Sequence, residues 1–315
     1  MRICRYLRND ELELGFYFDD VVVPLSDAIE AYERDTDFNM TLPDNSALDL
    51  LPHGAYSKEA QKLAAWLNES TEIRKNLALD TGKLNLRNPL PDPGKILLLA
   101  GNYALHIAEG GEIAEERNDT FPYVFMKPRT ALNHPNAEIV IPAINPDYID
   151  YECELTIVIG KTAKGVSEAD ALKYVAGYTI VNDISDRKYR PNPDRKERPK
   201  DTFFDWMHGK WHDGFCPVGP AVTSAKALPD PQCLDLRLTV NGEERQHSST
   251  ERMIFPVAAV VAFISSWVTL EPGDIIATGT CEGIGMASGK LLKPGDVVEA
   301  TIEGIGTLRN TMVAE

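Results

Sequence analysis

The hydrophobic pattern of the first part of the chain predicts short strands mixed with amphipathic helices. Residues 2–25 (RICRYLRNDELELGFYFDDVVVPL) are apolar runs separated by polar turns, which is typical of two or three strands. One helix is expected from Ser26, a candidate N-cap, and a second helix from Ser57. In the second helix the apolar residues recur at helical spacing, at Ala60, Leu63, Ala64 and Leu67.

A proline-marked segment, NPLPDPGK at residues 88–95, follows these elements. Because such a run favours a loop over a helix or strand, we place a domain boundary here. We expect a small N-terminal domain of residues 1–90 and a larger domain of residues 91–315. Two domains are also the usual expectation for a chain of 315 residues.

Beyond this boundary the pattern changes to short β-branched runs bounded by Gly, Pro, Asn and Asp. The runs are KILLLAGNY, AEIVIP, CELTIVIG, GYTIVND, LDLRLTVNGE, GDIIATGT and GDVVEATIEGIGTL. Only a few helices intervene, chiefly SEADALKYVA and MIFPVAAVVAFISSWV. Strands and helices do not alternate regularly, so the pattern favours a β-rich α+β fold, a sandwich or barrel-like roll, over a doubly wound sheet.

Composition narrows the partners and the compartment. A formal net charge of -16 argues against a nucleic-acid or anionic-membrane partner, because either would require a basic surface. The five cysteines are scattered without a CxxC pair, which is typical of reduced thiols and gives no zinc site. The opening MRICRYLRNDELELG lacks the apolar core of a signal peptide, and no run approaches the roughly 18 apolar residues of a membrane span. We therefore expect a cytoplasmic protein.

One strand carries a row of negative charge. The stretch DYECELTIVIG places Asp150, Glu152 and Glu154 at alternate positions. Alternate residues of a strand face the same side, so Glu152 and Glu154 project together. Two such carboxylates repel unless one is protonated or a cation lies between them. Spacing alone leaves two interpretations open: an acidic strand edge in solvent, which is commoner, or ligands for a hard divalent cation.

A third carboxylate is available at Asp183, where the GYTIVND strand ends. The segment Ser167–Ala176 between the two strands is expected to be a helix. A strand–helix–strand unit commonly sets its strands side by side, so Asp183 can return to the neighbourhood of Glu154.

Four further residues carry candidate chemistry. His106 and Glu109 are three residues apart and lie side by side on one helical turn. The carboxylate can raise the basicity of the imidazole, as activation of a water requires, although a surface His–Glu pair is commoner. Lys210 is by default a surface lysine. Thr280 lies in a glycine-rich turn that is either a plain hairpin or a receptor for a carboxylate.

Six sequence blocks resemble the fumarylacetoacetate hydrolase superfamily, in the order found there, over roughly residues 95–310. They are ECELTIVIGK, GYTIVNDISDR, the GK…DGFCPVGP run around Lys210, NGEERQ, LEPGDIIATGT and GD…EGIGTLRN. The resemblance implies the family's mixed β-sandwich roll with a smaller N-terminal α+β domain, and homodimers are common in such proteins. It also implies that Glu152, Glu154 and Asp183 bind Mg²⁺ or Mn²⁺, with Ca²⁺ as a possible substitute.

The resemblance assigns roles to other residues as well. A similar NYxxHxxE segment in the family maps His106 and Glu109 onto a dyad on a lid that orders over the substrate. The lysine that matches Lys210 points into the site, where it stabilises a developing enolate or oxyanion. Asp150 matches no family ligand, so we expect it to be solvated or to support the metal ligands.

Substrate contacts are expected at four positions. Thr280 matches a contact in the family, and Lys127 and Arg187 are cations in family blocks that bind substrate or instead pair with local acids. Arg190 departs from the family, which usually has a glutamine there. Because an arginine binds a carboxylate bidentately, we hypothesise an anionic tail on the substrate.

The expected function is a divalent-metal-dependent hydrolase that cleaves a C–C bond in a 2,4-dioxo (acylpyruvate-type) carboxylate, giving a 2-oxo acid and a carboxylic acid. The alternative is a lyase, decarboxylase, isomerase or dehydratase that acts on a 2-oxo (di)carboxylate or a 2-oxo-3-deoxy sugar acid through the same metal-enolate chemistry. A third interpretation is a non-catalytic metal-binding or ligand-binding protein. The intact candidate residues argue against it: Glu152, Glu154, Asp183, His106, Glu109 and Lys210.

Overall fold

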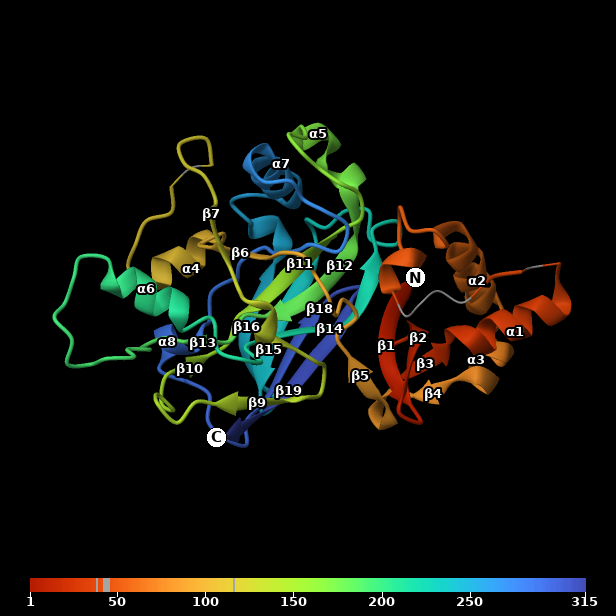
Figure 1. Cartoon of the computed structure of the whole chain (residues 1–315), viewed down its shortest axis with the longest axis horizontal. Coiled ribbons are helices and arrows are strands. Elements are labelled where there is room, and N and C mark those ends of the chain that lie inside the picture. The colour runs from red at the N-terminus through yellow and green to blue at the C-terminus, as the bar shows by residue number, and fades with distance from the viewer. Residues whose placement is uncertain (38, 42–45, 116) are drawn as a thin grey trace.

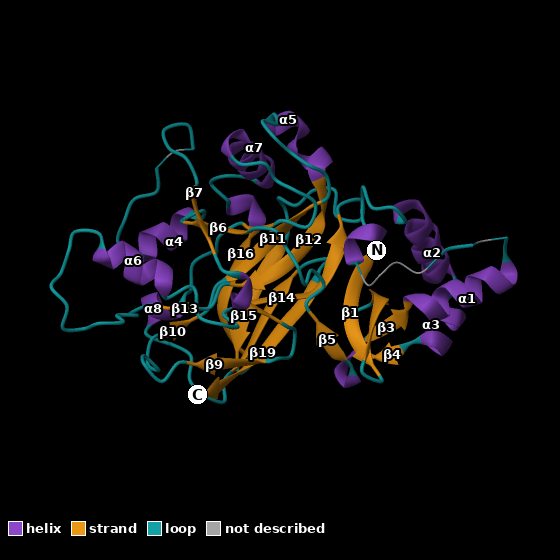
Figure 2. Cartoon of the chain, viewed as in Figure 1, coloured by secondary structure: helices purple, strands orange, loops and turns teal. Residues whose placement is uncertain are grey.

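The computed structural model describes residues 1–37, 39–41, 46–115 and 117–315, and its fold is α+β and rich in strands (Figure 1, Figure 2). The helices are α1 (Leu25–Asp35), α2 (Ser57–Glu69), α3 (Thr71–Leu77), α4 (Ala104–Glu109), α5 (Glu168–Ala171), α6 (Asp201–His208), α7 (Val257–Trp267) and α8 (Gly285–Ser288). Short 3₁₀ helices are η1 (Ala47–Leu50), η2 (Thr81–Lys83), η3 (Arg129–Ala131), η4 (Leu172–Tyr174) and η5 (Thr250–Arg252). The strands are β1 (Arg2–Arg8), β2 (Glu11–Tyr17), β3 (Val21–Pro24), β4 (Leu79–Asp80), β5 (Asn85–Arg87), β6 (Ile96–Ala100), β7 (Tyr123–Met126), β8 (Leu132–Asn133), β9 (Glu138–Ile141), β10 (Ile149–Asp150), β11 (Cys153–Ile159), β12 (Val175–Asn182), β13 (Ser185–Asp186), β14 (Cys216–Ser224), β15 (Asp235–Val240), β16 (Glu243–Ser249), β17 (Ile275–Ala277), β18 (Val297–Ile302) and β19 (Gly306–Ala314).

Most strands belong to two open sheets. The 12-stranded sheet has the order β4-β3-β2-β1-β14-β12-β11-β17-β6-β7, with β5 paired to β1 and β8 paired to β14. The 5-stranded sheet has the order β16-β15-β18-β19-β9, and β10 pairs with β13 in a separate ribbon. Apolar side chains of β11 and β12 share one buried core with those of β15, β18, β19 and α7. The expected packing of sheet on sheet is therefore present, and α7 adds to the same core.

The central pair of strands brings distant carboxylates together. Strands β11 and β12 run antiparallel, with Cys153 opposite Asn182. The amide of Asp183 donates a hydrogen bond to the carbonyl oxygen of Glu152 at 2.9 Å. Since opposite residues in such a pair are close neighbours, the end of β12 lies directly beside the start of β11.

The connection between these strands differs from the sequence expectation. Helix α5 and the 3₁₀ turn η4 end at Tyr174, and β12 already begins at Val175. A helix over the whole of Ser167–Ala176 is therefore wrong in extent. The reason is tertiary pairing: Gly177 lies opposite Ser224 of β14, in a strand whose every residue is buried. Burial within the sheet therefore overrides the helical propensity of Val175 and Ala176, the last two residues of the expected helix.

The N-terminal elements agree with their pattern apart from one helix start. Strands β1 to β3 form where short apolar runs were expected. Helix α1 begins at Leu25 with Pro24 in the N-cap position, so Ser26 is not the cap. Helix α2 begins at Ser57, and its buried apolar side chains are Ala60, Leu63, Ala64 and Leu67.

Hydrogen bonds of the sheet cross the boundary that the sequence suggested. Strand β1 pairs with β14, with Ile3 opposite Val222, so the N-terminal strands extend the large sheet (Figure 1, red beside cyan). One buried core contains Ile3 and Leu63 together with Val218 and Ile275. The division into residues 1–90 and 91–315 stays a prediction, and the two parts share a sheet and a core.

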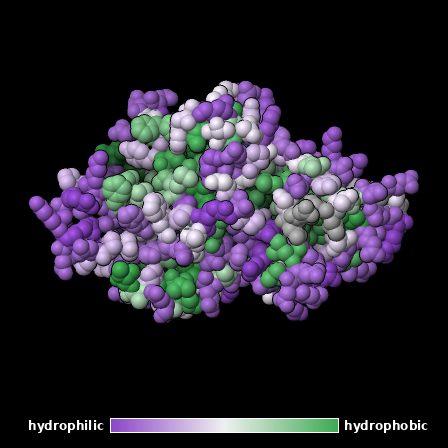
Figure 3. Space-filling model, in the orientation of Figure 1, coloured by the Kyte–Doolittle hydropathy of each residue, from purple (hydrophilic) through white to green (hydrophobic). Residues whose placement is uncertain are grey.

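No helix in the described ranges is both long and apolar enough to cross a membrane. The face seen in Figure 3 is mostly hydrophilic, with hydrophobic residues in small separate patches. All five cysteines are free, and only Cys233 is exposed.

Candidate active site

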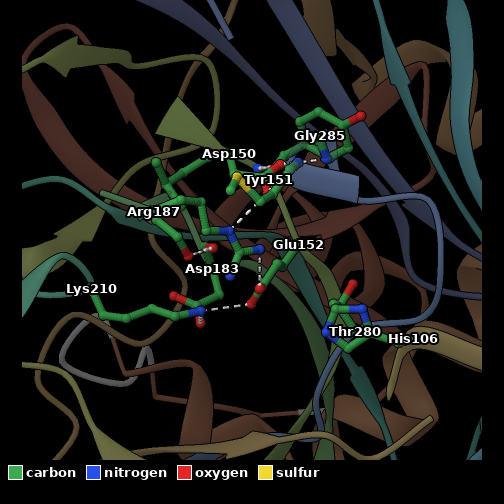
Figure 4. A network of polar contacts seen from close by, with 12 residues as sticks. His106, Asp150, Tyr151, Glu152, Asp183, Arg187, Lys210, Thr280 and Gly285 are labelled. Carbon is green, nitrogen blue, oxygen red and sulfur yellow. Dashed lines mark hydrogen bonds and ion pairs between the residues drawn. The ribbon is translucent and has the colours of Figure 1, made fainter. Parts of the chain in front are cut away.

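Three carboxylates from the ends of two neighbouring strands form the centre of the site. Glu152 immediately precedes β11, Glu154 lies within it, and Asp183 immediately follows β12. All three side chains are buried, and one oxygen of each lies within 4.8 Å of the others. Figure 4 shows Glu152 and Asp183 converging, with the ammonium group of Lys210 between them.

Glu154 is the residue whose charge is least compensated. Its Oε2 accepts a hydrogen bond from the Gly279 amide at 2.8 Å, whereas Oε1 is buried and has no hydrogen-bond partner among the described residues. Burial, and then the charges of Asp183 and Glu152, raise the pKa of Glu154 well above its ordinary value. A bare carboxylate oxygen beside two other carboxylates fits a hard divalent cation, which prefers oxygen ligands. These residues therefore fit Mg²⁺ or Mn²⁺.

Two lysines lie against the other two carboxylates. Lys210 Nζ donates to Glu152 Oε2 at 2.8 Å and to Asp183 Oδ2 at 2.5 Å. Lys127 Nζ forms an ion pair with Asp183 Oδ1 at 2.5 Å, and it donates hydrogen bonds to the carbonyl oxygens of Ile184 and Phe215. Burial would lower the pKa of Lys210, but Asp183 and Glu152 raise it, so this lysine stays charged.

Arg187 supports Glu152 from the opposite side. Its guanidinium donates to Glu152 Oε1 at 2.5 Å and to Asp150 Oδ2 at 2.8 Å. Burial would raise the pKa of Glu152, but Lys210 and Arg187 outweigh it and lower that pKa below the usual range. Arg187 therefore pairs with local acids, one of the two roles that the sequence allowed.

Asp150 is buried and fully engaged. Its Oδ1 accepts the amides of Tyr151 at 2.9 Å and Gly285 at 2.6 Å, and Oδ2 accepts the Met286 amide at 3.0 Å. The side chain has no exposed surface, so of the two roles expected for Asp150 the structure excludes solvation and agrees with support of the candidate metal ligands. Backbone amides at the start of α8 converge on it, which strand periodicity cannot reveal. Asp150 instead anchors Arg187, which holds Glu152.

The His–Glu pair lies on the short helix α4. His106 Nδ1 is 3.5 Å from Glu109 Oε2, and Glu109 Oε1 accepts the Gly283 amide at 2.7 Å. His106 Nδ1 is buried without a hydrogen bond among the described residues. The charge of His106 helps to lower the pKa of Glu152, so the imidazole is near enough to act on that carboxylate. The dyad therefore lies at the margin of the carboxylates.

Thr280 is held by a residue to which the sequence gave no role. Thr280 Oγ1 donates to the Cys153 carbonyl oxygen at 3.1 Å and accepts from Gln246 Nε2 at 2.8 Å. Gln246 Oε1 in turn accepts the Cys153 amide at 3.0 Å. Gln246 belongs to the NGEERQ block, which was a signal of family but not of position. It fixes the start of β11 and the threonine turn together.

Two aromatic rings flank the lysine and were not anticipated. Lys210 Nζ lies 5.4 Å from the ring centroid of Phe125 and 5.7 Å from that of Trp206. Such rings stabilise a cation where water is scarce. Arg190, by contrast, is not brought into this cluster. It is 40% exposed and its NH2 pairs with Glu197 Oε1 at 3.1 Å.

Comparison with known proteins decides the family. Residues 95–313 match the fumarylacetoacetate (FAA) hydrolase C-terminal domain. The chain belongs to the fumarylacetoacetate hydrolase family. The resemblance inferred from the six sequence blocks is thereby confirmed.

Relatives of the chain within the family include hydrolases and tautomerases. A 2,4-didehydro-3-deoxy-L-rhamnonate hydrolase of Sphingomonas sp. (strain SKA58) is 41% identical over 239 residues, covering 74% of this chain and 78% of the relative. A mitochondrial oxaloacetate tautomerase of Xenopus laevis is 35% identical over 237 residues, covering 75% of this chain and 70% of the relative. Family members with named activities are thus enzymes.

Solved structures of the family share the fold along the whole chain. Maleylpyruvate hydrolase of Sphingobium sp. SYK-6, in complex with manganese (II) ion and pyruvate, is 28% identical with a TM-score of 0.71, covering 100% of this chain and 99% of that one. A 5-carboxymethyl-2-hydroxymuconate delta-isomerase of Mycobacterium smegmatis is 30% identical with a TM-score of 0.70 and the same coverage. The expected α+β family fold is therefore confirmed.

The site of this family member combines three kinds of group. Buried carboxylates provide oxygen ligands, an imidazole–carboxylate pair can accept a proton, and a buried ammonium can stabilise negative charge. Together these groups suit reactions that generate and quench negative charge on a carbonyl oxygen.

Proposed function

We propose that the protein is a divalent-metal-dependent hydrolase that cleaves a C–C bond in an acylpyruvate-type 2,4-dioxo carboxylate. The observation that carries this proposal is the buried cluster of Glu152, Glu154 and Asp183, with the His106–Glu109 pair at its margin. The products would be a 2-oxo acid and a carboxylic acid. Support comes from the manganese and pyruvate in the maleylpyruvate hydrolase structure and from the rhamnonate-type hydrolase relative.

Each group has a part in this reaction. Glu152, Glu154 and Asp183 would hold Mg²⁺ or Mn²⁺, which supplies Lewis-acid polarisation of a carbonyl oxygen. His106, oriented by Glu109, accepts the proton of a water that attacks the carbonyl distant from the carboxylate end. Lys210 places a positive charge where the electron pair of the broken C–C bond is received. The small anionic substrate would thus be attracted by the positive charge of Lys210, although the chain as a whole is acidic.

A second candidate is an isomerase, tautomerase or decarboxylase that uses the same groups without water. Relatives with these names match over most of this chain, including the isomerase structure and a bifunctional isomerase/decarboxylase of Escherichia coli. Because His106 Nδ1 faces Glu109 Oε2 at 3.5 Å, Nε2 is the ring nitrogen that can take a proton, directly from carbon as well as from water.

A substrate panel in labelled water tests both candidates. Acylpyruvates, oxaloacetate and 2-oxo-3-deoxy sugar acids are assayed with Mg²⁺, with Mn²⁺ and after chelation. We expect turnover of an acylpyruvate that chelation abolishes, with ¹⁸O from the solvent in the acid product. Retained turnover after complete removal of metal would refute the metal-dependent mechanism. Turnover without ¹⁸O incorporation would favour the second candidate.

A further inference from the structure

A second group of buried charge lies away from the active site, at the seam between the N-terminal strands and the family domain. Along one edge of β14, β8 pairs at Cys216 and Pro217, whereas β1 pairs at Val222 and Thr223. Strand β5 lies against β1 beside this gap (Figure 1). We call the cationic residues here the seam cluster: Arg5 of β1, Arg87 of β5, and His134 just after β8.

Arg5 is buried without a counter-charge. Arg5 is 7% exposed, and its NH1 donates a hydrogen bond to the Asn88 carbonyl oxygen at 2.8 Å. Its Nε is buried and has no hydrogen-bond partner among the described residues. Arginine is almost never buried to this extent unless it is paired. Within the described ranges no carboxylate forms an ion pair with Arg5.

Arg87 makes the imbalance larger. It lies directly opposite Arg5 in the antiparallel β1–β5 pair, so both side chains leave the same face of the sheet with their Cβ atoms close together. Two like charges in this arrangement destabilise a sheet. Arg87 is half-buried, and among the described residues it has neither an ion pair nor a side-chain hydrogen bond.

His134 completes the cluster and supplies a donor rather than an acceptor. Its Nδ1 accepts the Asn88 amide at 3.1 Å, which leaves the ring proton on Nε2. Burial, and then the charges of Arg87 and Arg5, lower the pKa of His134. Burial and the charge of Arg87 likewise lower the pKa of Arg5. All three residues are thus arranged as if a negative charge belonged among them.

We propose that the seam cluster binds a small oxyanion of the phosphate or carboxylate type. A guanidinium offers parallel N–H donors that match the oxygens of such an anion, and two guanidiniums on one face would share it. The chain carries a net charge of -16, so retention of an uncompensated cationic pair at a buried seam is not explained by solubility. The anion would join two arginines of the N-terminal strands to a histidine of the family domain. It would therefore stabilise the contact between the two parts.

Thermal unfolding of the full-length protein tests this site. The midpoint is measured in a concentration series of sodium phosphate and, separately, sodium succinate, each against sodium chloride at equal ionic strength. We expect the anion that binds to raise the midpoint of the wild type by about 5 °C at a hundredfold excess over its Kd. The two series distinguish a phosphate from a carboxylate ligand.

The decisive variant is Arg87→Gln, because removal of one of two repelling charges has an opposite effect in each condition. In chloride alone the variant should unfold at the same temperature as the wild type or at a higher one. Its affinity for the anion, taken from the concentration series, should be at least about tenfold lower. Arg34→Gln is the matched control: it removes the same charge from α1, where Arg34 is exposed and pairs with Glu30. This control should keep the full response.

Three results would overturn the proposal. One is a wild type that does not respond to either anion beyond the chloride series. Another is an equal response in Arg87→Gln and the wild type, which would place anion binding elsewhere. The third is an Arg87→Gln variant that is destabilised in chloride and still responds, since Arg87 would then be only a part of the scaffold.

Discussion

The active site and the seam cluster both bury groups of like charge, but only the active site compensates most of that charge within the chain. In the active site the four acids are Asp150, Glu152, Glu154 and Asp183, and the three cations are Lys127, Arg187 and Lys210. In the seam cluster the described residues supply no acid at all. Since a buried charge is costly without a partner, the sign of the residual charge indicates the sign of the missing ligand.

The active site contains charged groups that are paired within the chain, and both regions contain a charged group that keeps an unpaired atom. Glu152 and Asp183 both accept hydrogen bonds from Lys210, so their negative charge is compensated within the chain. Glu154 keeps a bare oxygen, as Arg5 keeps a bare nitrogen. The unpartnered atom, rather than the density of charge, is the feature that the two regions share.

The largest expected effect comes from His106, which is not one of the four acids and three cations of the active site. His106→Ala leaves the four acids and three cations in place, so Mn²⁺ binding measured by electron paramagnetic resonance should be unchanged. Turnover should fall by about 10²–10⁴-fold, the usual contribution of a general base. His247→Ala is the control: His247 is exposed, pairs with Asp235 and should leave turnover unaltered. Normal turnover in His106→Ala would show that the dyad has no catalytic part.

The next effect compares two carboxylates that are two residues apart. Glu152→Gln removes the partner of Lys210 and Arg187 and leaves buried cations, which should destabilise the metal-free protein by about 3 kcal/mol. Glu154→Gln removes the least compensated charge and keeps an acceptor for the Gly279 amide, so it should stabilise the metal-free protein by about 1 kcal/mol at neutral pH. Both variants should lose the stabilisation that added Mn²⁺ gives. Chemical denaturation with and without chelator measures each value.

The pH dependence has opposite signs for these two residues. The folded-state pKa of Glu154 is raised, so its contribution to stability is present below its unfolded pKa, near 4.5, and is lost as the pH rises through the folded value. The folded-state pKa of Glu152 is lowered, so its contribution is present above that unfolded pKa and is lost as the pH falls. The free energy of unfolding, measured by chemical denaturation at a series of pH values, should therefore change less with pH above 4.5 in Glu154→Gln than in the wild type. Equal slopes in Glu154→Gln and the wild type would contradict this assignment.

The smallest effect is expected at Arg190. Its ion pair with Glu197 is exposed on both sides, and such pairs contribute little. Arg190→Gln should leave stability unchanged and alter the KM for a substrate with an anionic tail by less than about threefold, because the side chain lies outside the cluster. A KM that rises tenfold for the dicarboxylate, but not for a substrate with a neutral tail, would restore the role in substrate binding that the sequence suggested.

Local periodicity in the sequence predicted those features that depend on neighbours along one strand or helix. The alternation of Glu152 and Glu154, and the one-turn spacing of His106 and Glu109, both translated directly into shared faces. The approach of Asp183 to Glu154 was also expected, and the antiparallel pairing of β11 with β12 produces it.

Contacts between distant elements were beyond the reach of this reasoning. The burial of Asp150 depends on the amides of α8, more than 130 residues later, and Gln246 reaches back to Cys153 from β16. Trp206 flanks Lys210 only because α6 folds toward β7, where Phe125 lies. No local pattern encodes such partners, because each depends on the completed sheet. The seam cluster was missed for the same reason: its arginines are 82 residues apart and meet through the pairing of β1 with β5.

The pairing of β1 with β14 has a practical consequence for dissecting the protein. A fragment that starts in the proline-marked segment would leave the Val222 end of β14 as an unprotected sheet border, beside apolar side chains that Ile3 and Leu63 normally cover. Such borders recruit strands from other molecules. A protein truncated at residue 90 would thus be prone to aggregate and would not be a minimal enzyme, even though the family match begins at residue 95.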